Sequence, residues 1–363
     1  MEPTEEVVRQ KFQQYYLSSD MKLDSPRNPA EREYGFLLFK GKFMVRHRSF
    51  KTPEAVLGAI RDLVPAHVYF STAYYRDPTA AMEQKGWLGA DLVFDIDADH
   101  LETPCKPKHD NWKCKGCGTT GLGGSPKLCP KCKSDRMEEQ TWLCEQCLQH
   151  AKEETMKLLD MMHSDFSFNP KETSVFFSGH RGFHVHVHSE GLRIMGEEER
   201  RELSDYMMAQ GLEPELHGLF EVPIDGVKVL KDFDREDIFR KPVWSLFKGI
   251  GVSTWKSLVI KSVEKAKIDT VVTTDVHRLI RMSGTLNGHT GLLAMKVPEE
   301  GIDEFDPFTQ AVAFHGQMKV RVKESPEFRL AERYFGPYNN ENVELPSAAA
   351  ILLLCKHRAE PIA

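Results

Sequence analysis

Acidic and apolar residues alternate in the stretch that ends at Asp99. Successive side chains of a β-strand point to opposite faces, so we expect Asp95, Asp97 and Asp99 on one face and Phe94 and Ile96 on the other. Carboxylates crowded in this way repel one another unless a cation lies between them. Mg²⁺ or Mn²⁺ with oxygen ligands suits such a cluster. A solvated strand end with incidental acids is the alternative, because Asp-x-Asp alone is a weak signal.

Seven of the eight cysteines lie between residues 105 and 147. In a chain whose first residues lack a signal peptide, this clustering indicates metal binding in a reducing intracellular compartment rather than disulfides. One set has the spacing of a zinc ribbon, with two Cys-x-x-Cys knuckles around one tetrahedral ion: Cys114, Cys117, Cys129 and Cys132. The other set lacks a fourth ligand: Cys105, Cys144 and Cys147. His109 can supply that ligand, and His100 and His150 are its rivals.

A row of histidines follows in a predicted hairpin. Residues 173–178 and 183–188 have the composition of two strands, joined by a tight loop with Arg181. Three histidines share one face of the second strand: His184, His186 and His188. This row suits zinc ligation, acid–base work or hydrogen bonding to a polyphosphate whose oxygens Arg181 would grip. For each histidine taken singly, a buried ring with satisfied hydrogen bonds is the alternative.

A third informative segment runs from Ile268 to Gly291. We expect an extended run over 268–275, followed by residues 276–282 at helical spacing, so that Arg278 and Arg281 share a helix face. A carboxylate of this segment, Asp269 or Asp275, could complete the acidic cluster. Asp275 could instead cap the predicted helix.

The elements that must position these side chains can be traced along the chain. We expect a helix over 5–18, paired strands at 33–39 and 42–45, a helix from Pro53 to Leu63, and a strand at 67–70. Residues 191–265 have a helical pattern and carry no chemical motif. Three arginines are interpreted as solvated surface groups: Arg32, Arg46 and Arg76.

The whole chain has 363 residues and a formal charge of −6. This length predicts two or three domains or subdomains, and the charge argues against tight nucleic-acid binding by bulk electrostatics alone. The longest apolar run, residues 348–355, is too short to span a bilayer.

Four motifs in one order resemble the catalytic small subunit of archaeo-eukaryotic DNA primases, especially its archaeal branch. They are the Asp-x-Asp strand, the cysteine-rich insertion, the loop Ser178-Gly-His-Arg-Gly-Phe-His184, and the segment from Asp269 to Arg281. The resemblance covers the chain from about Arg32 to Gly291. It implies an α+β fold, with an RRM-like primase catalytic core of mixed sheets and helices. The implied divisions are a catalytic core (1–100, 150–190 and 266–363), a zinc-binding module (101–149) and a helical subdomain (191–265).

The resemblance also assigns candidate site residues. It implies Asp95, Asp97 and Asp269 as the ligands of catalytic Mg²⁺ or Mn²⁺. Asp269 is favoured over Asp275 because it lies twelve residues before Arg281, as in the family. The implied nucleotide-binding residues are Ser178, His180, Arg181, His184, Arg281, Asn287 and His289. The implied zinc ligands are Cys105, His109, Cys144 and Cys147, so that Cys114, Cys117, Cys129 and Cys132 form an extra knuckle set for a second zinc ion.

One segment departs from the family pattern. Where the family commonly has Ser-Leu-His-x-Lys-Thr-Gly-Leu, this chain has Thr285-Leu-Asn-Gly-His-Thr-Gly-Leu292. Asn287 and His289 thus replace a histidine and a lysine that would contact the triphosphate. Because the site is less cationic, we expect weaker nucleotide affinity.

The implied function is template-directed, de novo synthesis of short RNA or DNA primers on single-stranded DNA from nucleoside triphosphates. The implied partner is a large primase subunit with an iron–sulfur cluster, and the expected location is the cytoplasm of an archaeal cell. Two alternatives are a repair or translesion polymerase of the same superfamily and a zinc-ribbon nucleic-acid-binding protein without catalysis.

Overall fold

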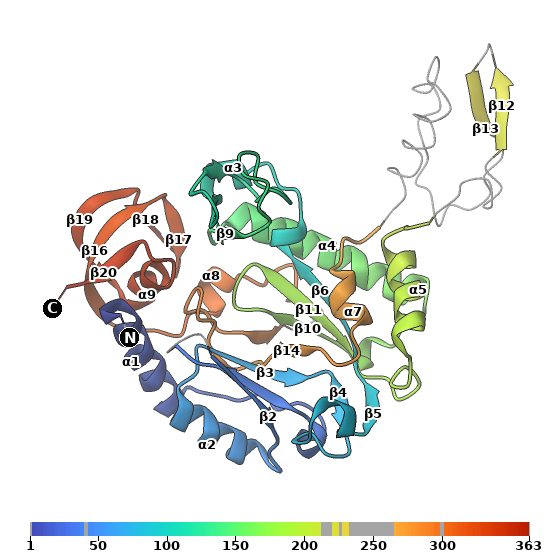
Figure 1. Cartoon of the computed structure of the whole chain (residues 1–363), viewed down its shortest axis with the longest axis horizontal. Helices are drawn as coiled ribbons and strands as arrows, with labels where there is room; N and C mark the ends of the chain where they lie inside the picture. The colour runs from blue at the N-terminus through green and yellow to red at the C-terminus, as the bar shows by residue number, and fades with distance from the viewer. Residues whose placement is uncertain are drawn as a thin grey trace.

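The computed structural model describes residues 2–39, 43–211, 220–224, 227–231, 265–297 and 301–362. Its architecture is α+β, which confirms the predicted fold class, and two four-stranded antiparallel sheets form its centre (Figure 1). Most of the buried apolar side chains of these sheets and the surrounding helices belong to one continuous core.

The first sheet is built mainly from the N-terminal part of the chain. Its strands, in spatial order, are β14 (Leu279–Arg281), β3 (His67–Ser71), β1 (Tyr34–Leu37) and β2 (Met44–Arg48). The predicted pairing of β1 with β2 and the predicted strand at β3 are confirmed. The turn between β1 and β2 lies outside the described residues.

The second sheet carries the acidic strand and the histidine row. Its strands, in spatial order, are β15 (Met295–Val297), β10 (Thr173–Phe177), β11 (Gly182–Val187) and β6 (Leu92–Asp97). The register of β11 against β6 sets His184 opposite Asp95 and Gly182 opposite Asp97. A Cβ atom at Gly182 would collide with the carbonyl oxygen of Ile96, so this close approach requires glycine.

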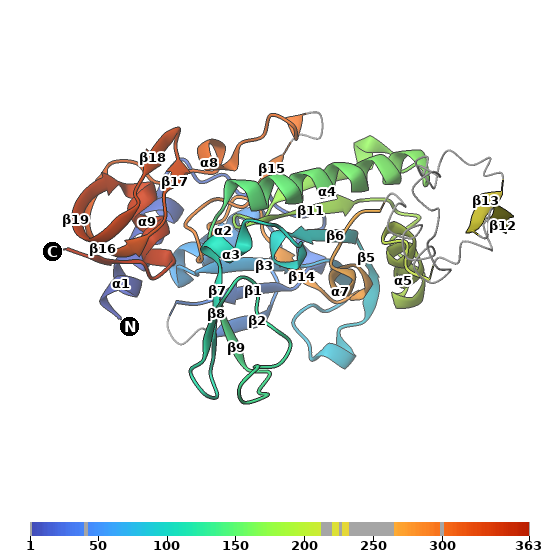
Figure 2. The ribbon, with the colours of Figure 1, turned by 90° about the horizontal axis from the view of Figure 1, so that it is seen from above.

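Helices cover the sheets. They are α1 (Pro3–Leu17), α2 (Pro53–Leu63), α4 (Glu145–Ser164) and α5 (Glu197–Met207). The predicted start of α2 is confirmed, because the Thr52 hydroxyl accepts a hydrogen bond from the Ala55 amide. The long helix α4 runs beside β11 and β6 (Figure 2). Among the described residues, every helix is too short or too polar to cross a lipid bilayer.

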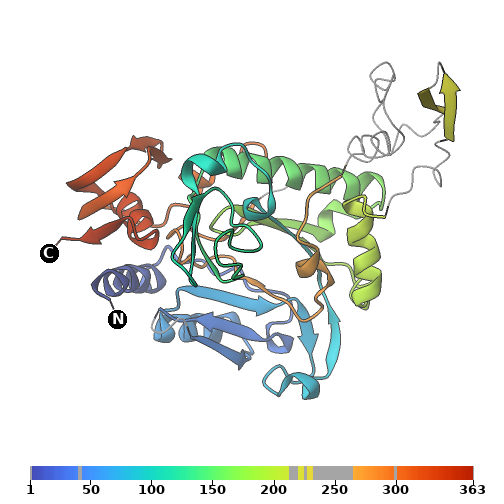
Figure 3. The ribbon, with the colours of Figure 1, turned by 45° about the horizontal axis from the view of Figure 1, so that its top comes forward.

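Residues 105–147 form a small module that we call the cysteine-rich module. It contains α3 (Lys106–His109), β7 (Asn111–Cys114), β8 (Thr120–Leu122) and β9 (Met137–Gln140). The three strands form their own antiparallel sheet in the order β8-β7-β9. Figure 3 shows the module at the front of the molecule, beside the first turns of α4.

Residues 317–361 form a second small module, which we call the C-terminal module. Its elements are β16 (Gln317–Ser325), β17 (Phe328–Leu330), β18 (Arg333–Phe335), β19 (Tyr338–Pro346), α9 (Ser347–Cys355) and β20 (Ala359–Pro361). The short helix α8 (Pro307–Gln310) precedes it. Helix α9 packs against α1, so the two ends of the chain meet at one side of the molecule (Figure 1).

The predicted helical segment 191–265 is only partly helical in the described residues. Helix α5 agrees with the prediction, whereas β12 (Phe220–Ile224) and β13 (Val227–Lys231) form an antiparallel hairpin. The lysine- and tryptophan-rich stretch from Val243 onward lies outside the described residues as far as 264. A further hairpin consists of β4 (Ala73–Tyr75) and β5 (Trp87–Ala90).

The interpretation of Arg32 as a solvated group is wrong. Its side chain is fully buried, donates hydrogen bonds to the carbonyl oxygens of Ser71 and Thr72, and forms an ion pair with Asp91. Burying a guanidinium is costly unless its charge and its donors are satisfied, and this network satisfies them. Arg46 is also paired, with its Nε 3.0 Å from the buried Glu33 carboxylate, and Arg76 is exposed as expected.

Candidate active site

Asp95 and Asp97 lie on the same face of β6, as the alternation of the sequence predicts. The Asp95 carboxylate faces His184 on the neighbouring strand, with Oδ1 3.3 Å from Nε2. Asp99 lies in a short turn after the strand, where its amide donates to the Asp97 carboxylate at 2.8 Å. Together with His180, Asp97 and Asp99 offer ligand atoms that all lie within 4.8 Å of one another.

Asp269 reaches the same place from a distant part of the chain. Its backbone amide donates to the carbonyl oxygen of Asp95 at 2.8 Å, and its carboxylate accepts from the Val271 amide as the N-cap of α7 (Thr270–Thr274). His100 lies beside it, with Nε2 3.7 Å from Oδ2. The predicted meeting of Asp269 with the acidic strand is therefore present in the structure.

The electrostatics of this acidic cluster follow from its burial. Desolvation, together with repulsion from the Asp97 and Asp269 carboxylates, raises the pKa of Asp95 to about 8, against an opposing effect of Arg278 and Arg281. Burial also raises the pKa of Asp97. Carboxylates that resist ionisation together are suited to a shared divalent cation, which would favour their charged forms.

The segment around these residues differs from the sequence-based prediction in its secondary structure. The expected extended run contains helix α7, and the expected helix contains strand β14, which pairs with β3. The prediction that Arg278 and Arg281 share a helix face is therefore wrong, because Arg281 is on β14 and Arg278 precedes it. The Arg281 guanidinium contacts His67 Nδ1 and lies 4.6 Å from the centre of the Tyr69 ring.

Arg181 is buried and already has protein partners. Its Nη1 donates to the Asp110 carboxylate at 2.8 Å and to the Trp142 carbonyl at 3.1 Å, and its Nη2 contacts Asp99. Its Nε has no hydrogen-bond partner among the described residues. In this arrangement the guanidinium connects the loop after β10 to the cysteine-rich module, and its binding of a triphosphate stays a prediction.

Asn287 connects the two loops that were expected to bind a nucleotide. Its side-chain amide donates to the Ser178 carbonyl at 3.1 Å, its side-chain oxygen accepts from the His289 amide at 2.9 Å, and the residue is 1% exposed. The rings of His289 and His180 lie 6.0 Å apart. The structure thus brings Ser178, His180, Asn287 and His289 together, with Asn287 as a buried link between the loops.

Histidines next to the acidic cluster are held neutral by burial. Desolvation, together with repulsion from Arg281 and Arg278, lowers the pKa of His184 to about 3. The pKa of His180 is also well below its usual value because of burial and the neighbouring Lys356. Neutral rings can donate one hydrogen bond and accept another, so these side chains are suited to orienting oxygen atoms.

Lys356 was missed by the sequence analysis. It follows α9 in the C-terminal module, which contains none of the site residues suggested by the sequence, and its Nζ lies 2.9 Å from His180 Nε2. Desolvation, together with repulsion from Arg181, lowers the pKa of Lys356 to about 7, against opposing effects of Cys355, Asp110 and Asp97. No sequence motif marks this lysine, since its position depends on how the C-terminal module packs on the core.

The cysteines form the two groups that the sequence predicts. Ligand atoms of the first group lie within 4.8 Å of one another: Cys105, His109, Cys144 and Cys147. The same holds for the second group: Cys114, Cys117, Cys129 and Cys132. Of the three histidines considered, the structure brings His109 to the first group, whereas His100 faces Asp269 and His150 faces Glu153.

His109 also contacts Asp110, with its Nδ1 2.7 Å from Oδ1. Such a carboxylate partner fixes the orientation of a metal-ligating imidazole and increases its basicity. The module therefore contains two groups able to bind a metal. In the first group, Asp110 also contacts the candidate ligand His109.

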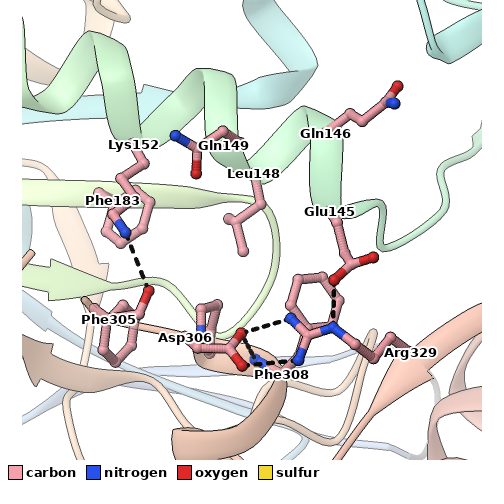
Figure 4. Close-up of a pocket in the computed structure, with 11 residues that line it drawn as sticks. Glu145, Gln146, Leu148, Gln149, Lys152, Phe183, Phe305, Asp306, Phe308 and Arg329 are labelled. Carbon is pink, nitrogen blue, oxygen red and sulfur yellow. Dashed lines mark hydrogen bonds and ion pairs between the residues drawn. The ribbon is translucent and has the colours of Figure 1, made fainter. Parts of the chain in front are cut away.

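A separate cavity of about 340 Å³ lies under the first half of α4 (Figure 4). Arg329 closes one side of it, with its Nη1 2.9 Å from the Asp306 carboxylate, and Lys152 donates to the Phe305 carbonyl at 3.4 Å. None of the catalytic or nucleotide-binding residues suggested by the sequence lines this cavity. The acidic cluster is thus the better candidate for the reaction site.

Comparisons with known proteins give matches over most of the chain. A family model described as DNA primase small subunit matches residues 133–297. Several archaeal relatives carry the name DNA primase small subunit PriS. The protein from Cenarchaeum symbiosum is 32% identical over 375 residues, which covers 96% of each chain. Those from Nitrosopumilus maritimus and Pyrobaculum arsenaticum are 32% and 37% identical, covering 96% and 80% of each chain.

Proposed function

This chain belongs to the DNA primase small-subunit family, and from that membership we propose that it synthesises short primers de novo on single-stranded DNA. It is the catalytic subunit of a primase, a DNA-directed RNA polymerase of the nucleotidyltransferase class. Its substrates are a DNA template and nucleoside triphosphates, and it works with a large subunit. The main support for the proposal is that Asp269 lies next to Asp95 and Asp97, close enough for their carboxylates to repel one another.

The three carboxylates fit a pair of divalent ions. They are hard oxygen donors, and their mutual repulsion raises the pKa of Asp95, which a bound cation would relieve. Asp95, Asp97 and Asp269 would hold Mg²⁺ or Mn²⁺, which when bound lowers the pKa of an attacking 3′-hydroxyl and stabilises a leaving pyrophosphate. His184 orients the Asp95 carboxylate through their 3.3 Å contact.

The nucleotide would lie against the loops beside this cluster. Ser178, His180 and His289 surround one end of it, and Arg281 lies on the neighbouring strand β14. Their hydrogen-bond donors would hold the phosphates, with His184 at the border to the metal-binding carboxylates. Arg181 and Asn287 would act by fixing the loops, because protein partners already occupy most of their polar atoms.

Two structural zinc ions and a protein partner complete the proposal. Three thiolates and one imidazole in the first group, and four thiolates in the second, lie within 4.8 Å of one another and suit tetrahedral Zn²⁺. The large subunit would carry an iron–sulfur cluster and contribute template affinity, which agrees with the formal charge of −6 of this chain. The proposed location is the cytoplasm of an archaeal cell.

The test is primer synthesis from labelled nucleoside triphosphates on single-stranded DNA, with and without the large subunit. Asp95→Ala should abolish synthesis in Mg²⁺ and in Mn²⁺, because the cluster loses one of its ligands. Asp160→Ala, which removes an exposed carboxylate on α4, is the matched control and should retain activity.

The other outcomes separate the alternatives. Extension of supplied primers without any de novo product would favour a repair or translesion polymerase. Template binding without incorporation in either metal would favour a zinc-ribbon binding protein and would refute the proposed function.

A further inference from the structure

Lys356 is a half-buried cation in an unusual setting. Its side chain is supplied by the C-terminal module, and its Nζ lies 2.9 Å from His180 Nε2. Among the described residues, no carboxylate lies within ion-pair distance of this Nζ. Asp97 and Asp110 act on this ammonium only from beyond that distance. A half-buried ammonium without a directly paired anion can accept an anion that is not part of the chain.

The position of Lys356 is fixed by packing and does not depend on a flexible surface segment. Gly291, in the loop that carries Asn287 and His289, has φ +75°, and a Cβ there would lie 2.6 Å from Ile351 Cγ2 of α9. The helix therefore sits directly on this loop, and Lys356 follows the last residue of the helix. Packing of the Ile351 side chain of α9 against the backbone of this loop fixes the end of the helix that precedes Lys356.

The imidazole of His180 links Lys356 to the acidic cluster. His180 contacts Lys356 through Nε2, and the same histidine belongs to the group with Asp97 and Asp99 whose ligand atoms lie within 4.8 Å. A triphosphate whose α-phosphate lies at the carboxylates extends its β- and γ-phosphates away from them. His180 and Lys356 supply a neutral and a cationic group next to Asp97 and Asp99, where the β- and γ-phosphates could be bound.

Two arginines of this region, Arg181 and Arg281, are less available to an anion. Arg181 is bound by Asp110 and Asp99, and Arg281 by His67 and the face of Tyr69. Lys356 therefore offers charge where the neighbouring guanidinium groups already have protein partners.

We propose that Lys356 is a triphosphate-binding residue, which the C-terminal module contributes to the nucleotide site. The ammonium would contact the β- or γ-phosphate, with His180 holding it in place. This inference rests on the proposed primase function, because it takes the nucleoside triphosphate as the ligand. It gives the C-terminal module a direct part in substrate binding.

The test compares the affinity of the full chain for ATP, AMP and inorganic tripolyphosphate in the presence of Mg²⁺, by calorimetric titration. Lys356→Met should weaken ATP and tripolyphosphate binding about tenfold, the loss expected for one charge-assisted hydrogen bond, and should leave AMP binding unchanged. Lys356→Arg should stay within about twofold of the native chain, since it retains the charge. Lys319→Met, an exposed lysine of the same module, is the control and should change nothing.

A structural role for Lys356 would give a different pattern. Equal loss of ATP and AMP binding, or no loss of either in a variant that melts like the native chain, would overturn the inference. If Lys356→Met does not fold, Lys356→Gln keeps a polar side chain without the charge and answers the same question.

Failure of the inference is distinguishable from failure of the proposed function. A native chain that makes primers, with a Lys356→Met variant of native affinity for tripolyphosphate, removes only the role of Lys356. A native chain that neither binds ATP nor makes primers removes both.

Discussion

At the scale of single residues, His186 shows what burial does to a titratable side chain. It lies between His184 and His188 on β11, is 3% exposed, and its ring centre is 4.7 Å from that of Phe176. Its Nε2 has no hydrogen-bond partner among the described residues. Burial lowers the pKa of His186 well below its usual value, and the neighbouring histidines lower it further.

This pKa shift predicts acid sensitivity. The unfolded chain binds a proton at His186 as the pH falls through about 6.5, while the folded chain does not, so the free energy of unfolding decreases below that pH. The contribution of one such histidine is at most about 1.4 kcal/mol per pH unit. His186→Phe should therefore lose less stability than the native chain between pH 7.5 and pH 5.5, as measured by urea unfolding.

The control for this prediction is His150→Phe, which replaces an exposed histidine on α4. It should retain the acid sensitivity of the native chain. Equal sensitivity of the native chain and His186→Phe would show that His186 is not a source of the effect.

Individual side chains were the least predictable part of the site. Asp95, Asp97 and Asp269 could be found from the sequence, because alternation on a strand and a family resemblance mark them. Lys356 and the buried network of Arg32 could not, since each depends on partners far away along the chain. The sequence around a lysine or arginine does not show whether its side chain is solvated or enclosed, because tertiary packing decides between the two.

At the scale of elements, the strands with alternating polarity and the capped helices were predictable. The segment from Asp269 to Arg281 was not. Its Val and Thr residues favour an extended chain, yet α7 forms there because Asp269 caps the helix and its amide is hydrogen bonded to Asp95. Pairing with β3 then imposes a strand on β14, so tertiary contacts override the local preference twice in succession.

The cysteine-rich module yields a prediction at this scale. Its two metal-binding groups have different structural surroundings. The first joins residues at α3 to the first turn of α4 and includes the buried Cys105 and Cys147. The second lies within the hairpins, with Cys117 and Cys132 exposed. Loss of the first group should therefore disturb the core, and loss of the second should remain local.

We expect two zinc ions per native chain by elemental analysis. Cys147→Ser should bind one ion and unfold at a markedly lower temperature, because α4 loses its attachment to the module. Cys132→Ser should also bind one ion but should melt close to the native temperature. Cys355→Ser, outside both groups, is the control and should retain two ions. One ion or none in the native chain would contradict the assignment.

At the scale of the whole molecule, two consecutive residues of one loop are held by different modules. His180 contacts Lys356 of the C-terminal module, and Arg181 is bound by Asp110 of the cysteine-rich module. The loop itself belongs to the central sheet that carries Asp95 and Asp97. The two small modules therefore meet the reaction site at adjacent positions, although they are separated in the sequence by much of the core.

Asp110 is the residue through which this arrangement can be tested. Its carboxylate contacts the candidate metal ligand His109 at 2.7 Å, accepts from the Trp142 amide at 2.8 Å and pairs with Arg181. Asp110→Asn keeps the size and an oxygen acceptor but removes the charge opposite the buried guanidinium. Breaking a buried ion pair by neutralising one partner should lower the free energy of unfolding by about 3 kcal/mol.

The same substitution should reduce primer synthesis while zinc content stays at two ions per chain, because the loop with His180 and Arg181 loses its attachment and the four ligands of each group remain. Asp135→Asn, an exposed aspartate of the same module, should leave synthesis, stability and zinc content unchanged. Loss of a zinc ion in Asp110→Asn would mean that the carboxylate acts chiefly on His109. Native activity and stability would instead mean that the module does not support the reaction site through this contact.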